Sequence, residues 1–179
     1  MKILKWLLII LAVLIIALLG YLAYLGAFSS LKVTEMKMGP YVLVYEDYMG
    51  PYSGIGPVLN RVNASLKQKG IESSKGFGIY LDDPKLVKAD KLRSKLGFII
   101  EAKDRSKVGK QVKLMNWPTK MCLVTELPIR SNLSYMIGPM KAYPALAQYA
   151  KDKSIKISQA MEIYDMPAKK IFFIMVTAK

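Results

Sequence analysis

The predicted order of secondary-structure elements repeats within this chain, and that repeat constrains the fold more than any other feature. The stretch "YVLVYEDYM" is β-branched and aromatic and ends at Gly50-Pro51, which predicts a strand followed by a turn. A helix is expected over about 57–69, with Pro57 in its first turn and Gly70 at its end. Strands are then expected in "GFGIYLDD" and "KLRSKLGFII". The unit is therefore β-α-β-β.

The second half of the chain follows the same order. "MCLVTELPI" predicts a strand, "IGPMKAYPALAQYAKDKSI" contains a helix, and "AMEIYDM" and "KKIFFIMVTAK" predict two more strands. The words "IGP" at Ile55 and "IY" at Ile79 recur at Ile137 and Ile163. Such short words can coincide by chance, but the shared element order favours a duplicated module. We therefore expect an α+β fold with modules at about 40–101 and 112–179.

Two such modules, each with one helix on one face of a sheet, would leave a concave seam where they meet. Seams of this kind commonly hold small ligands. The sequence thus predicts a ligand pocket between the modules.

The chain also begins with a long apolar segment, since no charged residue occurs from Trp6 to Leu31. As a helix, its most apolar part, Leu7 to Phe28, would be roughly 33 Å long at about 1.5 Å per residue, which matches the hydrocarbon core of a bilayer. We predict a single-pass transmembrane anchor over residues 1–30 and a ligand-binding domain over 31–179. A cleaved signal peptide is the competing interpretation, although the run is long for one and offers a poor cleavage site.

The orientation of this anchor rests on few charges. Lys2 and Lys5 precede the apolar run, and Lys32 and Lys37 follow it. This slight bias favours the amino terminus inside, which in a bacterial host places the domain outside the cytoplasm.

The chain is strongly basic, with 27 Lys and Arg residues against 13 acidic ones and a net charge of +14. Anionic partners are therefore favoured. The basic runs lack interleaved aromatics and known nucleic-acid-binding motifs, so no nucleic acid is expected. Contact with anionic lipid is one use of the first basic run, and a solvated surface is the alternative. The residues concerned are Lys85, Lys88, Lys91, Arg93 and Lys95.

The chain has no histidine and one cysteine, Cys122. This composition excludes a structural zinc set, a Ser-His-Asp or Cys-His arrangement and an intramolecular disulfide. Cys122 lies in the apolar run "MCLVTEL" and is predicted to be a small core residue.

The words "YMGPYSGIGP" and "GIYLDDPKLVKADKLRSKLGFII" resemble the GyrI-like small-molecule-binding domain, which is also the effector-binding domain of some AraC-type and multidrug-responsive regulators. The resemblance runs from about residue 41 to 179 and is carried by Gly50-Pro51-Tyr52, Asp83-Pro84 and Leu92-Arg93. It implies a central cleft lined by aromatics, with an acidic residue that meets cationic or polar ligand groups. The fold also has SOUL-like haem-binding relatives, but no histidine is available here as an axial ligand, and no cofactor is expected.

Glu162 in "AMEIYDMP" matches the cleft glutamate of that domain, and it should share a strand face with Tyr164. A carboxylate inside an aromatic cleft would attract cationic ligands and have a raised pKa. An exposed glutamate at a sheet edge is the alternative. Tyr52 follows Gly50-Pro51 and is expected at the mouth of the cleft, or else packed on its own helix. Further ligand-binding aromatics are expected among Phe77, Tyr80, Trp117 and Tyr143.

Three functions remain open from the sequence. The leading one is a membrane-anchored module that binds small amphipathic or cationic molecules in an acidic-aromatic cleft. A hydrolase of small electrophilic ligands is the second, with Glu162 as general base and Tyr164 or Tyr52 orienting the substrate. A membrane-surface adaptor that uses the basic residues Lys88, Lys91 and Lys95 is the third.

Overall fold

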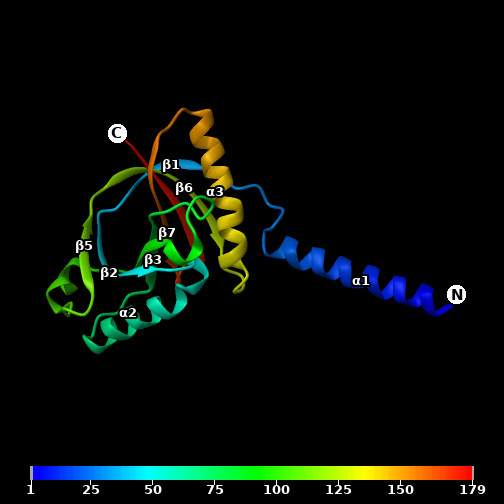
Figure 1. The fold of residues 1–179 in the computed structure, drawn as a ribbon, viewed down its shortest axis with the longest axis horizontal. Coiled ribbons are helices and arrows are strands. Elements are labelled where there is room, and N and C mark those ends of the chain that lie inside the picture. Colours follow the sequence, from blue (N-terminus) through cyan, green and yellow to red (C-terminus); the bar gives the residue numbers. More distant parts are fainter. Residues whose placement is uncertain (1, 179) are drawn as a thin grey trace.

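The computed structural model describes residues 2–178 and shows an α+β domain from which one long helix projects (Figure 1). All the strands form a single eight-stranded antiparallel sheet. The helices are α1 (Lys2–Tyr24), α2 (Gly56–Gln68) and α3 (Ser134–Asp152). The strands are β1 (Thr34–Met38), β2 (Tyr41–Met49), β3 (Lys75–Tyr80), β4 (Arg93–Ile100), β5 (Lys113–Trp117), β6 (Lys120–Pro128), β7 (Ile157–Asp165) and β8 (Lys170–Thr177). Every strand and helix expected from the sequence is present.

The strand order is β1-β6-β8-β7-β3-β4-β2-β5, and this order is symmetric. If β1, β2, β3 and β4 are exchanged with β5, β6, β7 and β8 respectively, the result is the same order read backwards. The two modules therefore meet at the centre, where β3 pairs with β7. Each module also begins with a short strand that the sequence did not predict. These two strands, β1 and β5, lie at the edges of the sheet and pair with the opposite module.

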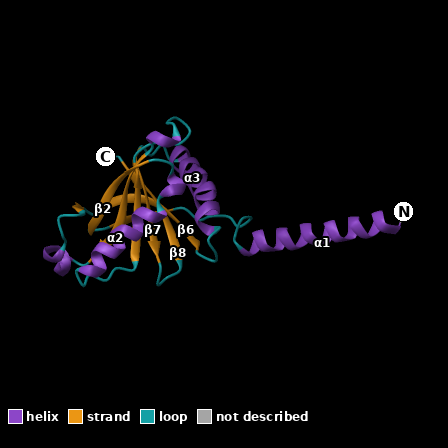
Figure 2. Cartoon of the chain, turned by 60° about the horizontal axis from the view of Figure 1, so that its bottom comes forward, coloured by secondary structure: helices purple, strands orange, loops and turns teal. Residues whose placement is uncertain are grey.

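One face of the sheet curls around a core of its own side chains. This core joins residues from both halves, including Leu43, Phe77, Val124, Met161 and Ile174. The other face carries both domain helices, with α2 against β2 and β4 and α3 against β6 and β8 (Figure 2). The strands β3 and β7 run between the two helices, where the two halves of the strand order meet, and we call this central strip the seam.

The two domain helices form for the reasons that the sequence suggested. In α2, Val58, Val62 and Leu66 recur at helical spacing and are buried, while Pro57 occupies the first turn. The helix stops before Gly70, whose φ of +66° suits glycine. The second helix starts at Ser134, three residues before the recurring "IGP".

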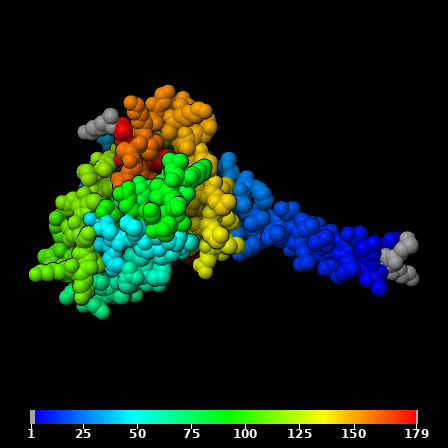
Figure 3. Space-filling model, viewed as in Figure 1, coloured from blue at the N-terminus to red at the C-terminus, as the bar shows by residue number. Residues whose placement is uncertain are grey.

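The N-terminal helix α1 extends away from the domain and has the dimensions of a membrane span. The most apolar 18-residue window within Ile3–Tyr24 has a mean hydropathy of 2.9, and none of it is buried. The helix ends where Gly26 takes a φ of +81°, and Leu25 just before it is fully buried in the domain. Figure 3 shows this connecting segment directly beside α3. A signal sequence would have the same length and composition, so the helix by itself establishes only the capacity to span.

Candidate functional site

The acidic residue singled out in the sequence lies on the central seam. Glu162 on β7 is paired with Gly78 on β3, and both face the side of the sheet that carries the helices. Tyr164 follows two residues later on the same face, and Tyr80 lies two residues after Gly78 on the neighbouring strand. Glu162 is only 4% exposed, so it is not an exposed sheet-edge residue.

Three tyrosine hydroxyls surround the Glu162 carboxylate. Tyr143, which comes from α3, donates to Oε1 over 2.8 Å. Tyr164 donates to Oε2 over 2.8 Å, and Tyr80 lies 3.5 Å from the same oxygen. The hydroxyls of Tyr80 and Tyr164 are also 2.8 Å apart, so the four polar groups form one connected network. Aromatic residues from both strands and from α3 thus hold a single buried acid.

Two glycines in "KGFGIY" make room for this arrangement. A Cβ atom added to Gly78 would lie 2.9 Å from the Tyr80 hydroxyl and 3.0 Å from the adjoining ring carbon. At Gly76 an added Cβ would meet the Tyr164 ring at 3.4 Å. The absence of side chains at these two positions lets both rings lie flat over β3 toward the carboxylate.

A second layer of tyrosines repeats the symmetry of the modules. Tyr52, in the turn before α2, packs edge-on against Tyr80 with ring centres 4.7 Å apart. Tyr135, at the start of α3, packs edge-on against Tyr164 at 5.8 Å. Edge-to-face contacts of this kind are favourable between aromatic rings. Tyr52 also donates its hydroxyl to the Asp82 carbonyl over 2.8 Å, which fixes its ring at the rim of the site.

Burial dominates the protonation behaviour of the cluster. Desolvation raises the pKa of Glu162, and the hydrogen bonds from Tyr164, Tyr143 and Tyr80 offset part of that rise. Desolvation together with the nearby Glu162 charge raises the pKa of each of those three tyrosines well above its ordinary value. The phenols therefore remain protonated donors at any physiological pH.

The charge of Glu162 has no ion-pair partner among the basic side chains of residues 3–178. The basic side chains of that range make their ion pairs with other acids, such as Asp47, Asp82 and Glu126. The same range contains no cluster of three His, Cys, Asp or Glu side chains that could hold a metal ion. The carboxylate is thus compensated only by phenol dipoles.

The predicted cleft is filled by tyrosine rings in this structure. Open depressions occur elsewhere on the surface, one of about 500 Å³ that includes Glu35 and Ile155, the other of about 300 Å³ that includes Tyr41 and Trp117. Neither borders Glu162. A ligand that reached the carboxylate would have to displace at least one of the rings that cover it.

Two of the predicted ligand-binding aromatics do not join this cluster. Phe77 and Trp117 belong to the core on the opposite face of the sheet. The reason is strand alternation: Phe77 lies between Gly76 and Gly78, so its side chain points away from the face that Glu162 occupies. Tyr135 was missed by sequence reasoning, because the recurring "IGP" aligns Tyr52 with Ser134, one residue before Tyr135.

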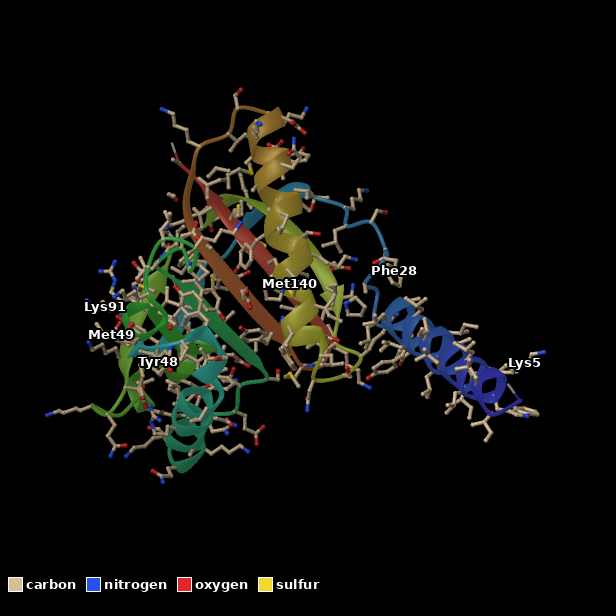
Figure 4. All side chains as sticks on the ribbon, turned by 45° about the vertical axis from the view of Figure 1, so that its right-hand side comes forward. Lys5, Phe28, Tyr48, Met49, Lys91 and Met140 are labelled. Carbon is tan, nitrogen blue, oxygen red and sulfur yellow. The ribbon has the colours of Figure 1, made fainter. Side chains whose placement is uncertain are left out.

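The basic run that was considered for lipid contact lies away from the N-terminal helix. Figure 4 places Lys91 on the side of the domain opposite Lys5 and Phe28. Two of its cations are already paired, Arg93 with Asp82 at 2.8 Å and Lys95 with Asp47 at 2.7 Å. The structure therefore gives no support to lipid binding through residues 85–95.

Solved structures share this architecture, which is consistent with a GyrI-like fold. The C-terminal domain of EcmrR matches with a TM-score of 0.63 at 10% identity, over 83% of this chain and 98% of that one. SAV2435 bound to tetraphenylphosphonium matches with a TM-score of 0.55 at 8% identity, over 82% and 94%. A structure described as a hydrolase from Listeria innocua matches with a TM-score of 0.52 at 10% identity, over 83% and 93%. At these identities the matches establish the fold alone.

No model of a protein family matches the chain. Among curated proteins, human testis-expressed protein 264 is 23% identical over 162 residues, which cover 84% of this chain. The matched region is 50% of that protein, so the chain spans about half the length of the curated relative. The relationship is distant.

Proposed function

We propose that this protein binds small amphipathic cations at a membrane, with Glu162 as the counter-charge of the ligand. In this proposal, residues 1–30 form a single-pass anchor and residues 31–179 form the ligand-binding domain. The observation that carries the proposal is the buried Glu162 carboxylate, which lies among three tyrosine hydroxyls. No basic side chain of residues 3–178 forms an ion pair with it.

An organic cation would complete this site chemically. A carboxylate in a low-dielectric surrounding interacts strongly with a positive charge, and it lacks one here. The rings of Tyr52, Tyr80 and Tyr143 would supply flat aromatic faces, which attract cations and bury apolar groups. The phosphonium bound by SAV2435 combines a positive charge with aromatic groups and is therefore a suitable probe.

Ligand entry would require the aromatic cover to open. Tyr52 is held at the rim by its hydroxyl, which donates to the Asp82 carbonyl and accepts from the Asp82 backbone N–H, and by its edge-on contact with Tyr80. Its hydroxyl is also close to the Arg93 carbonyl at 3.3 Å. Rotation of Tyr52 and Tyr80 would expose Oε2 of Glu162 without disturbing the backbone pairing of β3 and β7.

The first test is equilibrium dialysis of tetraphenylphosphonium against the full chain in detergent micelles, with triphenylphosphine oxide as a neutral aromatic comparison. Glu162→Gln keeps the shape of the side chain and removes the charge. We expect this variant to weaken phosphonium binding by at least about tenfold, equivalent to about 1.4 kcal/mol. Binding of the neutral compound should change little.

The matched control is Glu126→Gln on β6, which removes the same charge from an exposed residue paired with Lys170. This variant should bind the phosphonium as the parent does. An equal loss in both variants would mean that overall charge is responsible, and unchanged binding in Glu162→Gln would refute the role of Glu162.

A hydrolase remains a second candidate because the pKa of Glu162 is raised and Tyr164 donates to it. A carboxylate with a raised pKa is suited to act as a general base, and a phenol beside it could orient a substrate. Turnover of an electrophilic substrate that Glu162→Gln abolishes, while binding persists, would favour this function over simple binding.

A further inference from the structure

The segment that follows α1 is hydrogen-bonded to α3 and partly buried in the domain. Lys141 on α3 donates its ammonium group to the carbonyls of Gly26 and Ser29, the latter over 2.6 Å, and lies 3.2 Å from the Ser29 hydroxyl. Burial lowers the pKa of this lysine. Leu25 is fully buried, and the Arg130 guanidinium lies 5.0 Å from the centre of the Tyr24 ring. These contacts attach the end of α1 and the segment after it to the domain near α3.

The outer face of the first half of α3 is unusually apolar for an exposed surface. Leu133, the residue just before α3, and Met136 and Met140 within it lie at helical spacing and are 40%, 65% and 76% exposed. Figure 4 shows Met140 on the side of the domain from which α1 projects, whereas Met49 and Lys91 lie on the far side. An apolar patch of this kind on a soluble surface normally marks a contact site.

The position of Tyr24 relates this patch to the bilayer. The apolar stretch Ile3–Tyr24 ends at this residue, where a span of that length would leave the hydrocarbon core. Tyrosines are common at that level, and Arg130, which contacts the Tyr24 ring, would meet the lipid headgroups. Only three residues separate Arg130 from Ser134, where α3 begins.

We propose that Leu133, Met136 and Met140 dip into the interface of the membrane that α1 spans, with Arg130 among the headgroups. The occupant of this apolar face is the lipid surface itself. An exposed apolar helix face beside a cation is the arrangement by which helices lie in a membrane interface. Tyr143, which donates to Glu162, lies on the same helix as this patch. This inference rests on the anchoring part of the proposed function.

The test uses the full chain in vesicles of phosphatidylcholine and phosphatidylglycerol, with nitroxide labels on single introduced cysteines. Cys122 is fully buried, so the parent chain serves as the blank for labelling. Met140→Cys reports on the patch, and Met49→Cys, a second exposed methionine on the far side, is the matched control. Leu14→Cys, in the middle of α1, reports separately on anchoring. The measurement is collision of each label with oxygen, which partitions into lipid, and with a water-soluble nickel complex.

We expect the oxygen-to-nickel collision ratio at position 140 to be severalfold higher than at position 49 and to approach that at position 14. A water-like ratio at 140 together with a lipid-like ratio at 14 would overturn the contact and leave the anchor intact. A water-like ratio at 14 would overturn the anchor and the contact together. Phosphonium binding in micelles tests the Glu162 site independently of all three outcomes.

Discussion

The hydroxyls of Tyr80 and Tyr164, two residues at equivalent positions in the two modules, lie 2.8 Å apart across the β3–β7 seam. The symmetry is broken beside them, because the residue paired with Glu162 is Gly78. One carboxylate therefore occupies the centre of an otherwise symmetric aromatic cluster. Because Gly78 has no side chain, the Tyr80 ring has space to lie beside the Glu162 carboxylate.

Removing one phenol donor should destabilise the protein measurably. Tyr143→Phe leaves Oε1 of buried Glu162 without its hydrogen bond, and loss of a bond to a charged group costs about 1.5–3 kcal/mol. Tyr149→Phe on the same helix removes a bond to exposed Glu35 and should have a much smaller effect. Denaturant unfolding in micelles measures both, and equal losses would contradict the special position of Tyr143.

Stability should fall with rising pH through the titration of Glu162. Burial raises the pKa of this group in the folded state, so the folded protein holds the proton more tightly than the unfolded chain. The resulting stability is fully present below the unfolded pKa and is lost as pH rises through the folded pKa. The difference in unfolding free energy between the parent and Glu162→Gln should therefore shift against the parent from about pH 4.5 upward. A difference independent of pH would exclude this linkage.

Two glycines should respond in opposite directions to alanine. A Cβ atom at Gly97 on β4 would lie 1.8 Å from the Val44 carbonyl oxygen, so the pairing of β2 with β4 would have to shift. We expect Gly97→Ala to cost at least about 3 kcal/mol. Gly56, in the first turn of α2, has open space around it, and Gly56→Ala should stabilise by about 0.4–1 kcal/mol. Thermal unfolding distinguishes the two, and a tolerated Gly97→Ala would mean that β2 and β4 pair differently.

The ion pairs of Asp47 should contribute little and respond to salt. Asp47 accepts from Lys95 at 2.7 Å and from Lys113 at 2.6 Å, and these bonds lower its pKa. Its side chain is partly exposed, so Asp47→Asn should cost roughly 0.2–1 kcal/mol in dilute buffer. That cost should shrink in molar salt, where charges are screened within about 3 Å. A loss that salt does not change would indicate a packing effect instead.

The contact between the connecting segment and α3 should protect Lys32 from trypsin. Lys141→Ala removes the ammonium group that holds the Gly26 and Ser29 carbonyls, so the segment should detach and cleavage after Lys32 should quicken severalfold. Lys151→Ala, in the last turn of α3, is the control and should leave the rate unchanged. Limited proteolysis followed by mass spectrometry reports the outcome. Equal rates in the parent and both variants would show that Lys141 does not hold this segment.

Local sequence patterns determined the elements of this protein and their order. Gly50-Pro51 ends the strand β2, and Gly70 follows the end of α2. The apolar spacing of 57–69 predicted the helix α2, and the words "IGP" and "IY" indicated the repeat. The long uncharged run at the start produced the helix α1. Glu162 and Tyr164 could be placed on one strand face, because side chains alternate along a strand with a period of two.

Contacts between distant residues were decided only by the tertiary structure. The edge strands β1 and β5 are short and form by pairing with the other module, which no local pattern records. Phe77 was expected beside Glu162, but the β3–β7 register and the alternation of side chains put it in the opposite core. The same register brought Tyr80 to Glu162, and the packing of α3 brought Tyr143 there. Periodicity fixes which side of an element faces inward, whereas the partners on that side depend on how the elements pack together.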